Sequence, residues 1–374
     1  MMRAVFLWHI YDLSKSTAVL SLVGLLSFLP APIASLAGGA IADAYDRRKI
    51  VLVAQTIGLC CASMLCILGA TGAASVPLML AIIVINAGAS AFEAPARQAT
   101  LPTLVPKEEF SRAVTVMGTG GAFAFVSGPA LGGVLIAAHS VAFAYGCAAV
   151  LYVVSMLLVS RVQMPRAGAD SKRAISIAGL LEAMRFLKQK PVILAAMTID
   201  LFAVVFGGAT ALLPVYANEI LAVGETGYGL LAASFEIGAL LTSLLLIVFP
   251  PMRRLGRAIV TSVVVYGLAT IVFGISRSFP LSIAAYVLAG MADQVSVVGR
   301  STLVQTETPD ELRGRVSSVN MIFIGASNQL STAEAGLVAH LTSPTISVVS
   351  GGMMVLVVAA LAVVLVPRLW RVTG

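Results

Sequence analysis

Long apolar segments with almost no charged residue run through nearly the whole chain, and they constrain its fold more than any other feature. Ten or eleven such segments alternate with short loops that are rich in arginine. A run of about 20 apolar residues is long enough to cross a bilayer as a helix. Charged residues make up only 11% of the sequence, whereas a soluble domain carries about 25%. The chain is therefore predicted to be an all-α protein that crosses a membrane many times.

Hydropathy predicts eleven complete membrane helices and one partial helix at the N-terminus. The complete segments are 18–42, 50–70, 77–97, 113–137, 140–160, 191–217, 224–249, 258–276, 280–300, 314–339 and 343–366. Residues 1–11, MMRAVFLWHIY, are too short to span a bilayer and are predicted to be the second half of helix 1. The coding sequence is therefore expected to continue in frame upstream of Met1 for about 30–40 residues. The complete helices are numbered 2 to 12 on this basis.

The basic residues predict the orientation of the helices. The net charge is +7, and if the 43–49 loop is cytoplasmic, all Lys and Arg except Arg3, Lys15 and Arg277 lie at the cytoplasmic face. This bias sets orientation in membrane proteins, so the central linker and the C-terminus are predicted to be cytoplasmic. The basic residues are not interleaved with aromatic residues as in nucleic-acid binders. We therefore expect the lipid bilayer, and no nucleic acid, as a partner.

No motif for an enzyme, a metal or a cofactor occurs in the sequence. The cysteines lie inside predicted spans without the spacing of disulfides or metal ligands: Cys60, Cys61, Cys66 and Cys147. The three histidines are scattered along the chain. Neither GxxxxGK[ST] nor HExxH is present. We expect no enzymatic activity, no catalytic residue, no metal and no cofactor.

The longest polar stretch divides the chain into two halves. Residues 161–190 are predicted to be a cytoplasmic linker, whose second part forms an amphipathic helix on the membrane surface. A helical bundle of residues 1–160 precedes it, and a second bundle of residues 191–374 follows. The segments 96–113 and 299–316 align without gaps and with a constant offset, and both lie on the predicted cytoplasmic side. Two parallel halves of six helices are the layout of major facilitator transporters.

The segment GGAIADAYDRRK, which closes helix 2, resembles the loop signature of the major facilitator superfamily. The resemblance implies a gating latch in which Gly39 allows close packing and Asp43 faces the positive N-terminus of helix 11, near Arg315. Arg47 matches the second latch position. A plain positive-inside loop explains the basic residues equally well, but it explains neither Gly39 nor Asp43.

Three further segments resemble one branch of this superfamily, the enterobactin-exporter-like transporters or transmembrane secretion effectors. The segments are IDLFAVVFGGATALLPVYA, DQVSVVGRSTLVQTETPDELRGRVSSVN and FIGASNQL. The resemblance implies an inner-membrane efflux pump that is driven by ions, usually protons. Family members export siderophores, macrolides and other small molecules.

Five acidic residues lie in the interior of predicted spans, where a charge costs about 2.5–3.5 kcal/mol. Asp200 lies near mid-bilayer with no basic residue in its own span, and Glu236 lies at similar depth in helix 8. Burial favours the neutral, proton-bound form of a carboxyl group. We therefore expect Asp200 to carry the coupled proton, with Glu236 as the second candidate. A protonated Asp200 that hydrogen-bonds a neighbouring helix is the structural alternative.

The other intramembrane acids have different expected roles. Glu93 and Arg97 are one helical turn apart, and Asp293 and Arg300 are two turns apart, so both pairs are expected to form neutralised ion pairs. Glu334 matches an acid of the family's helix-11 pattern, but Gln329 and Thr332 replace its two companions. This departure weakens any coupling role for that cluster.

Helix 5 and the central cavity supply the remaining candidate residues. The GPxxGG pattern resembles an antiporter signature and predicts a bend, with simple close packing as the alternative. Its residues are Gly128, Pro129, Gly132 and Gly133. The residues expected to face a substrate cavity are Asn86, Asp200, Phe206, Asp293 and Asn328.

These observations predict a major facilitator fold in a monomer that exports a small amphipathic or hydrophobic molecule by alternating access, coupled to protons. The alternative is an N-terminally truncated membrane protein that does not transport. It would be either a degenerate fragment or an interaction partner of another protein. The retained interior acids, which a decayed pump does not need, favour the transporter.

Replacement of Asp43 by Asn tests the latch. The change removes a charge–dipole interaction of about 0.3–1 kcal/mol, so the state that is closed at the cytoplasmic side loses population. Transport is expected to fall although the protein still inserts and folds. An export assay on matched amounts of membrane-inserted protein measures this fall. Wild-type export by a well-expressed Asp43→Asn protein contradicts the latch.

Overall fold

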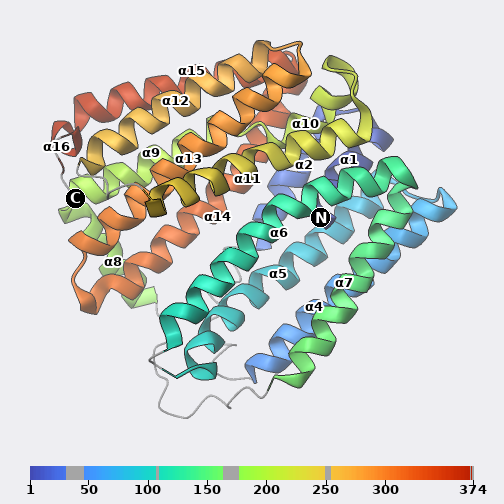
Figure 1. The fold of residues 1–374 in the computed structure, drawn as a ribbon, viewed down its shortest axis with the longest axis horizontal. Helices are drawn as coiled ribbons and strands as arrows, with labels where there is room; N and C mark the ends of the chain where they lie inside the picture. The colour runs from blue at the N-terminus through green and yellow to red at the C-terminus, as the bar shows by residue number, and fades with distance from the viewer. Residues whose placement is uncertain (31–45, 107–108, 163–176, 249–253, 371, 373–374) are drawn as a thin grey trace. The chain divides into compact units, whose positions relative to one another are not determined.

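The computed structural model describes residues 1–30, 46–106, 109–162, 177–248, 254–370 and 372. These residues form helices joined by short turns, with no strand among them (Figure 1). Nine of the described helices are long and apolar enough to cross a membrane. The all-α, multi-pass architecture predicted from hydropathy is therefore confirmed.

The chain divides into two compact units. Unit 1 comprises Met1–Lys15 and Leu25–Ile177, and unit 2 comprises Ser16–Gly24 and Ala178–Gly374. The boundary after Ile177 falls inside the predicted linker, so the linker helix belongs to unit 2. The sequence placed residues 16–24 in the first bundle, but the structure groups them with the second.

Close backbone packing explains this grouping of Ser16–Gly24. Helix α2 (Thr17–Phe28) lies against α14 (Asp310–Leu341) through small residues. A Cβ on Gly24 would lie only 2.5 Å from the backbone nitrogen of Ala333, and the hydroxyl of Ser21 donates a hydrogen bond of 2.6 Å to the Ala333 carbonyl. Glycine at a helix crossing permits such an approach.

In its described residues, unit 1 contains five long or partial helices. They are α1 (Met2–Ser14), α4 (Arg47–Thr71), α5 (Val76–Leu104), α6 (Phe110–Ala138) and α7 (Val141–Arg161). Helix α4 packs against α5 and α7, and α1 packs against α6 and α7 (Figure 1). The predicted helix-1 remnant is thus helical, and it ends where Lys15 takes the left-handed conformation with φ 47°.

Unit 2 contains the helices that carry most of the intramembrane acids. They are α8 (Ile177–Gln189), α9 (Pro191–Gly207), α10 (Leu213–Val215), α11 (Gly224–Val248), α12 (Leu255–Ile275), α13 (Phe279–Glu307), α14, α15 (Pro344–Leu365) and α16 (Pro367–Trp370). Helix α10 is flanked by a short 3₁₀ turn, Thr210–Leu212, and by a π turn, Tyr216–Ile220. Together with α9 these turns form one candidate membrane span, Pro191–Ile220. Helix α13 packs against α11 and α12, and α9 packs against α14 and α15.

The sequence sets where several of these helices begin. Asp46 caps α4 by accepting a hydrogen bond of 2.9 Å from the backbone N–H of Arg48. Ser140 and Ser343 cap α7 and α15 in the same way. Proline stands in the first turn of α5, α9, α13 and α15, where its missing N–H costs nothing. Helices α13 and α14 extend several residues beyond the predicted spans, because polar turns continue a helix outside its apolar stretch.

The glycine-rich motif of α6 serves close packing in unit 1. Pro129 lies inside the continuous helix Phe110–Ala138. A Cβ on Gly128 would lie 2.6 Å from the backbone nitrogen of Met1, and one on Gly132 would lie 3.1 Å from the side chain of Val5. Gly132 and Gly133 are buried. The contacts agree with the packing alternative, while the gating bend stays a prediction.

Two glycines let α11 and α13 cross at short range. A Cβ on Gly238 would overlap the backbone carbonyl of Val287, and a Cβ on Gly290 would overlap the carbonyl of Phe235. Each glycine thus accommodates the backbone of the opposite helix. This crossing places the middle of α11, including Glu236, beside the middle of α13, including Asp293.

Substitution of Gly238 by Ala tests the crossing. The added methyl must displace a backbone carbonyl, so we expect unfolding to become easier by about 1–3 kcal/mol, seen as a lower thermal midpoint of the purified protein. Gly325→Ala in α14 is the matched control, because nothing lies within 4 Å of its Cβ position. Equal midpoints for the two variants contradict the close crossing.

Candidate functional site

A buried ion pair between α9 and α13 is the centre of the candidate site. The Nη2 atom of Arg300 lies 3.0 Å from Oδ2 of Asp200, and the two side chains are only 2% and 6% exposed. Arg300 is among the largest fully buried side chains of the described residues. A buried ionised group is stable only when it is paired and hydrogen-bonded, so these two residues depend on each other.

Asn320 of α14 is the second partner of Arg300. Its Oδ1 atom accepts a hydrogen bond of 2.6 Å from Nη1 of Arg300. The Nε atom of Arg300 is buried and has no hydrogen-bond partner in the described structure. Three helices, α9, α13 and α14, therefore meet at one guanidinium group.

Two further acids lie in the electrostatic neighbourhood of this pair. Asp293, two turns before Arg300 on α13, interacts with the charges of Asp200, Arg300 and Glu236. Both Asp293 and Glu236 are half-buried, and neither forms an ion pair within the described residues. We call Asp200, Glu236, Asp293, Arg300 and Asn320 the buried charge cluster.

The structure corrects two expectations about these residues. Arg300 pairs with Asp200 and not with Asp293, and Asp200 is not without a cation. The spacing along α13 did place Asp293 and Arg300 on one face, but it could not reveal that α9 lies close enough to offer a nearer carboxylate. The premise that Asp200 is an isolated acid is therefore wrong, and no observation tests which acid carries a coupled proton.

The cluster contains more negative than positive groups. Among the described residues the cluster holds three carboxyl groups and one guanidinium, which contacts Asp200, and charges inside protein attract and repel more strongly than in water. Like charges that are close together cannot all be ionised cheaply, so such groups titrate as a coupled set. Chemically, the arrangement is suited to holding at least one exchangeable proton.

An apolar layer separates the cluster from the adjacent helix ends. Helix α8 contributes Ala183 and Leu187, both fully buried, to a hydrophobic core cluster of unit 2. The other buried members of that cluster are Ile193, Met197, Val304, Val316 and Val319. Met197 precedes Asp200 by three residues, and Val319 precedes Asn320 by one, so the layer lies between the cluster and the ends of α9, α13 and α14.

The linker helix was expected to lie on the membrane surface, but its buried residues pack against protein. Leu187 is fully buried and Met184 is half-buried, while Leu181 is 52% exposed. Glu182, Arg185 and Lys188 are exposed, as the amphipathic pattern predicted. The apolar side chains near the end of α8 thus cover the end of unit 2.

Two exposed ion pairs fasten α8 and its following turn. Arg315 of α14 pairs with Glu182 of α8, and Lys190 lies 3.7 Å from Glu307 at the end of α13. All four side chains are about half-exposed, and such pairs contribute about 0–1 kcal/mol each. Arg315, predicted near the latch, is therefore engaged by the linker helix.

The structure describes only some of the other latch residues. Gly39 and Asp43 lie outside the described residues, so the latch stays a prediction. Arg47 begins α4, and the neighbouring Arg48 donates a hydrogen bond to the carbonyl of Ser160 at the end of α7.

In unit 1 the expected ion pair between Glu93 and Arg97 does not form between these two described residues. Glu93 accepts a hydrogen bond of 3.4 Å from Nε2 of Gln55 on α4, and the same nitrogen donates to Ser155 of α7 at 3.0 Å. Arg97 is exposed. One-turn spacing brings two residues to one helix face, but a buried partner on α4 orients the Glu93 side chain elsewhere.

The remaining cavity candidates differ in their surroundings. Asn86 is a half-buried residue of α5 in unit 1. In unit 2, Phe206 is half-buried near the end of α9 and stacks on Phe202 with ring centroids 6.1 Å apart. Asn328 of α14 is exposed, and its amide donates to the carbonyl of Ile324. Their role toward a substrate stays a prediction.

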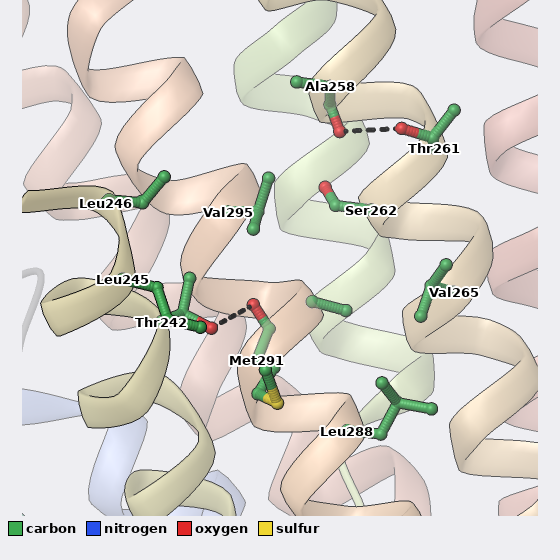
Figure 2. Close-up of a pocket in the computed structure, with 11 residues that line it drawn as sticks. Thr242, Leu245, Leu246, Ala258, Thr261, Ser262, Val265, Leu288, Met291 and Val295 are labelled. Carbon is green, nitrogen blue, oxygen red and sulfur yellow. Dashed lines mark hydrogen bonds between the residues drawn. The ribbon is translucent and has the colours of Figure 1, made fainter. Parts of the chain in front are cut away.

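An open pocket of about 500 Å³ lies between α11, α12 and α13 (Figure 2). Its lining is almost wholly apolar, and its hydroxyl groups bond to backbone carbonyls, as Thr242 does to Met291. Leu288, Met291 and Val295 bring one face of α13 to it, whereas Asp293 and Arg300 lie on another face. The pocket therefore offers no charged or free polar group for recognising a substrate.

Sequence reasoning missed Asn320 altogether. Nothing in its neighbourhood, RVSSVNMIF, marks it as a partner of a buried cation. The only usable signal was the amphipathic position of an amide in a membrane helix, where a polar group needs a partner. No group of three or more His, Cys, Asp or Glu suited to a metal occurs among the described residues.

The fold and the comparisons with solved structures define the class of the protein. A peptide transporter of the POT family aligns with a TM-score of 0.75 at 12% identity, covering 100% of this chain and 92% of that one. A bacterial homologue of the human lysosomal transporter Spinster aligns at 0.71 with 16% identity, covering 97% and 95%. At such identities the likeness shows the fold alone, and this fold is that of major facilitator transporters.

Sequence comparison gives the family. Residues 1–371 match the model of the transmembrane secretion effectors, and the chain belongs to this family of membrane transporters. It is 27% identical to the enterobactin exporter EntS of Citrobacter koseri over 347 residues, which cover 90% of this chain and 80% of that protein. It is 25% identical to the multidrug efflux pump Tap of Mycolicibacterium fortuitum over 385 residues, covering 97% and 91%. The resemblance seen in the sequence is thus confirmed.

Removal of Arg300 tests the energetics of the cluster. Arg300→Met leaves Asp200 buried without its cation, and we expect unfolding to become easier by about 3–5 kcal/mol. The double variant Arg300→Met with Asp200→Leu removes both charges and is expected to recover most of that loss. Thermal unfolding of the purified proteins measures both.

Arg277→Met is the control for the loss of an arginine, because Arg277 is exposed. It should change stability by no more than about 0.5 kcal/mol. A double variant that is as unstable as Arg300→Met contradicts the mutual dependence of the pair.

Proposed function

We propose that this transporter exports a small amphipathic or hydrophobic molecule from the cytoplasm by alternating access, in exchange for protons. The single observation that supports the coupling is the buried charge cluster, in which three carboxyl groups accompany one guanidinium and that guanidinium contacts Asp200. Export as the direction is supported by the relatives, an enterobactin exporter and a multidrug efflux pump. Siderophore-like and drug-like molecules are accordingly the substrate class.

We assign the proton to the acids that no cation contacts. Asp200 is held at 3.0 Å by Arg300, and such a pair favours the ionised carboxylate. Glu236 and Asp293 have no ion-pair partner among the described residues, so binding a proton relieves both their burial and their mutual repulsion. In this scheme Glu236 and Asp293 exchange the coupled proton, while Asp200 balances Arg300.

We place the protein in the inner membrane as a monomer, with the central linker and C-terminus cytoplasmic. The bias of basic residues toward one set of loops supports this orientation. The end of unit 2 that α8 covers then faces the cytoplasm. Neither catalysis nor binding of nucleic acid is part of the proposal.

Transport in proteoliposomes with an imposed pH gradient tests the coupling. Dyes, macrolides and catecholate siderophores serve as candidate substrates, with and without an uncoupler. Glu236→Gln and Asp293→Asn are expected to lose uphill transport by at least about tenfold while they retain downhill exchange, because a neutral amide mimics a permanently protonated acid. Asp200→Asn is expected instead to lower stability, because it leaves Arg300 unpaired.

Glu225→Gln is the matched control, because Glu225 lies three turns before Glu236, in the first turn of the same helix. It should transport like the unmodified protein. Uphill export that survives the uncoupler, or that survives both Glu236→Gln and Asp293→Asn, contradicts proton coupling through these acids. Absence of export for the whole panel favours the alternative of a membrane protein that does not transport.

A further inference from the structure

Arg300 has more than one carboxylate within reach of its charge, and something must decide which one it contacts. Asp200 lies 3.0 Å from Nη2, and Asp293 lies two turns away on the same helix and within the influence of the Arg300 charge. An arginine side chain is long and flexible, so its own helix does not fix its direction. A second contact is needed to hold the guanidinium.

The hydrogen bond to Asn320 is that contact. The guanidinium group is planar and presents its donors in a fixed fork. With Nη1 held 2.6 Å from Oδ1 of Asn320 on α14, the position of Nη2 follows, and Nη2 faces Asp200 on α9. Nε has no hydrogen-bond partner in the described structure, so the two Nη contacts alone set the orientation.

The other groups around the cluster do not compete for this role. Among the described charged and titratable side chains that interact with Asp293, Glu236 of α11 is an acid, and Tyr266 of α12 and Tyr286 of α13 are neutral phenols. The Tyr286 hydroxyl is 3.2 Å from the hydroxyl of Thr210. Asn320 is therefore the described neutral group that directly holds the cation.

We propose that Asn320 is a positioning residue that assigns Arg300 to Asp200 and so leaves Asp293 and Glu236 to bind the coupled proton. This inference rests on the proposed function, since it names the residue that sorts the acids of the same cluster. Without the hydrogen bond to Asn320, the guanidinium group of Arg300 is able to turn toward Asp293. Asp293 then holds its negative charge more strongly, and Asp200, which loses its cation, takes up the proton in its place.

The test uses two substitutions with opposite expected signs. Asn320→Leu removes the acceptor and frees Arg300 to neutralise Asp293, so the midpoint of Asp293 protonation shifts toward acid by about 1 pH unit, while that of Asp200 shifts toward alkali. Asn320→Asp keeps the shape but adds a negative charge beside Nη1, which weakens the hold of Arg300 on the other acids. The midpoint of Asp293 protonation then shifts toward alkali by a similar amount.

Infrared absorption of protonated carboxyl groups, titrated with pH in the purified protein, gives these midpoints without any transport. The pH profile of export is recorded in parallel. Combining Asn320→Leu with Asp293→Asn is expected to abolish the acid shift, because that shift requires Asp293. Gln305→Glu, an exposed amide-to-acid change on α13, is expected to leave the midpoint in place.

Shifts of opposite sign that depend on Asp293 support the proposal. Equal or absent shifts for Asn320→Leu and Asn320→Asp, or an acid shift that persists without Asp293, overturn it. Asn320→Gln keeps an acceptor oxygen and should stay near the unmodified midpoint, which separates positioning from a loss of folding. If the infrared midpoints move as expected but export does not depend on a proton gradient, the proposed function fails while the positioning role stands.

Discussion

One buried guanidinium group organises the second unit of this transporter. Arg300 is 2% exposed within a helix that is long and apolar enough to cross the membrane. A cation in that place is tolerated only with partners, and its two partners come from two other helices, Asp200 from α9 and Asn320 from α14. The need to satisfy this one group therefore fixes how α9, α13 and α14 meet.

The apolar layer beside the cluster follows from the same need. Charges interact strongly only where water is excluded. The buried side chains Ala183 and Leu187 of α8 pack with Met197, Val304 and Val319, which lie one turn or less from the cluster residues. The linker helix thus does more than join two units, because it closes the end of the helices that hold the charges. Two exposed ion pairs hold it there, Glu182 in the middle of α8 with Arg315 and Lys190, just after its last residue, with Glu307.

The sequence placed Asp200 inside the protein, as the structure shows, but it gave the wrong partners for Glu93 and Arg300. The rule that intramembrane acids face the protein interior holds for Asp200, which is 4% exposed. The pairing rules failed, because they consider residues on one helix only. Glu93 turns to Gln55 on α4 rather than to Arg97, and Arg300 turns to Asp200 on α9 rather than to Asp293. In both cases a partner from another helix lay closer than the one along the chain.

The sequence by itself determined the class of this protein: many apolar helices, the two related halves and the transmembrane secretion effector family. Those features depend on composition, periodicity and local motifs, which do not require knowledge of neighbours in space. The tertiary structure alone decided which acid Arg300 neutralises, that Asn320 holds it, and that Ala183 and Leu187 of α8 pack against the end of unit 2. A buried charge selects its partners by distance in three dimensions, and no spacing along one helix encodes that distance.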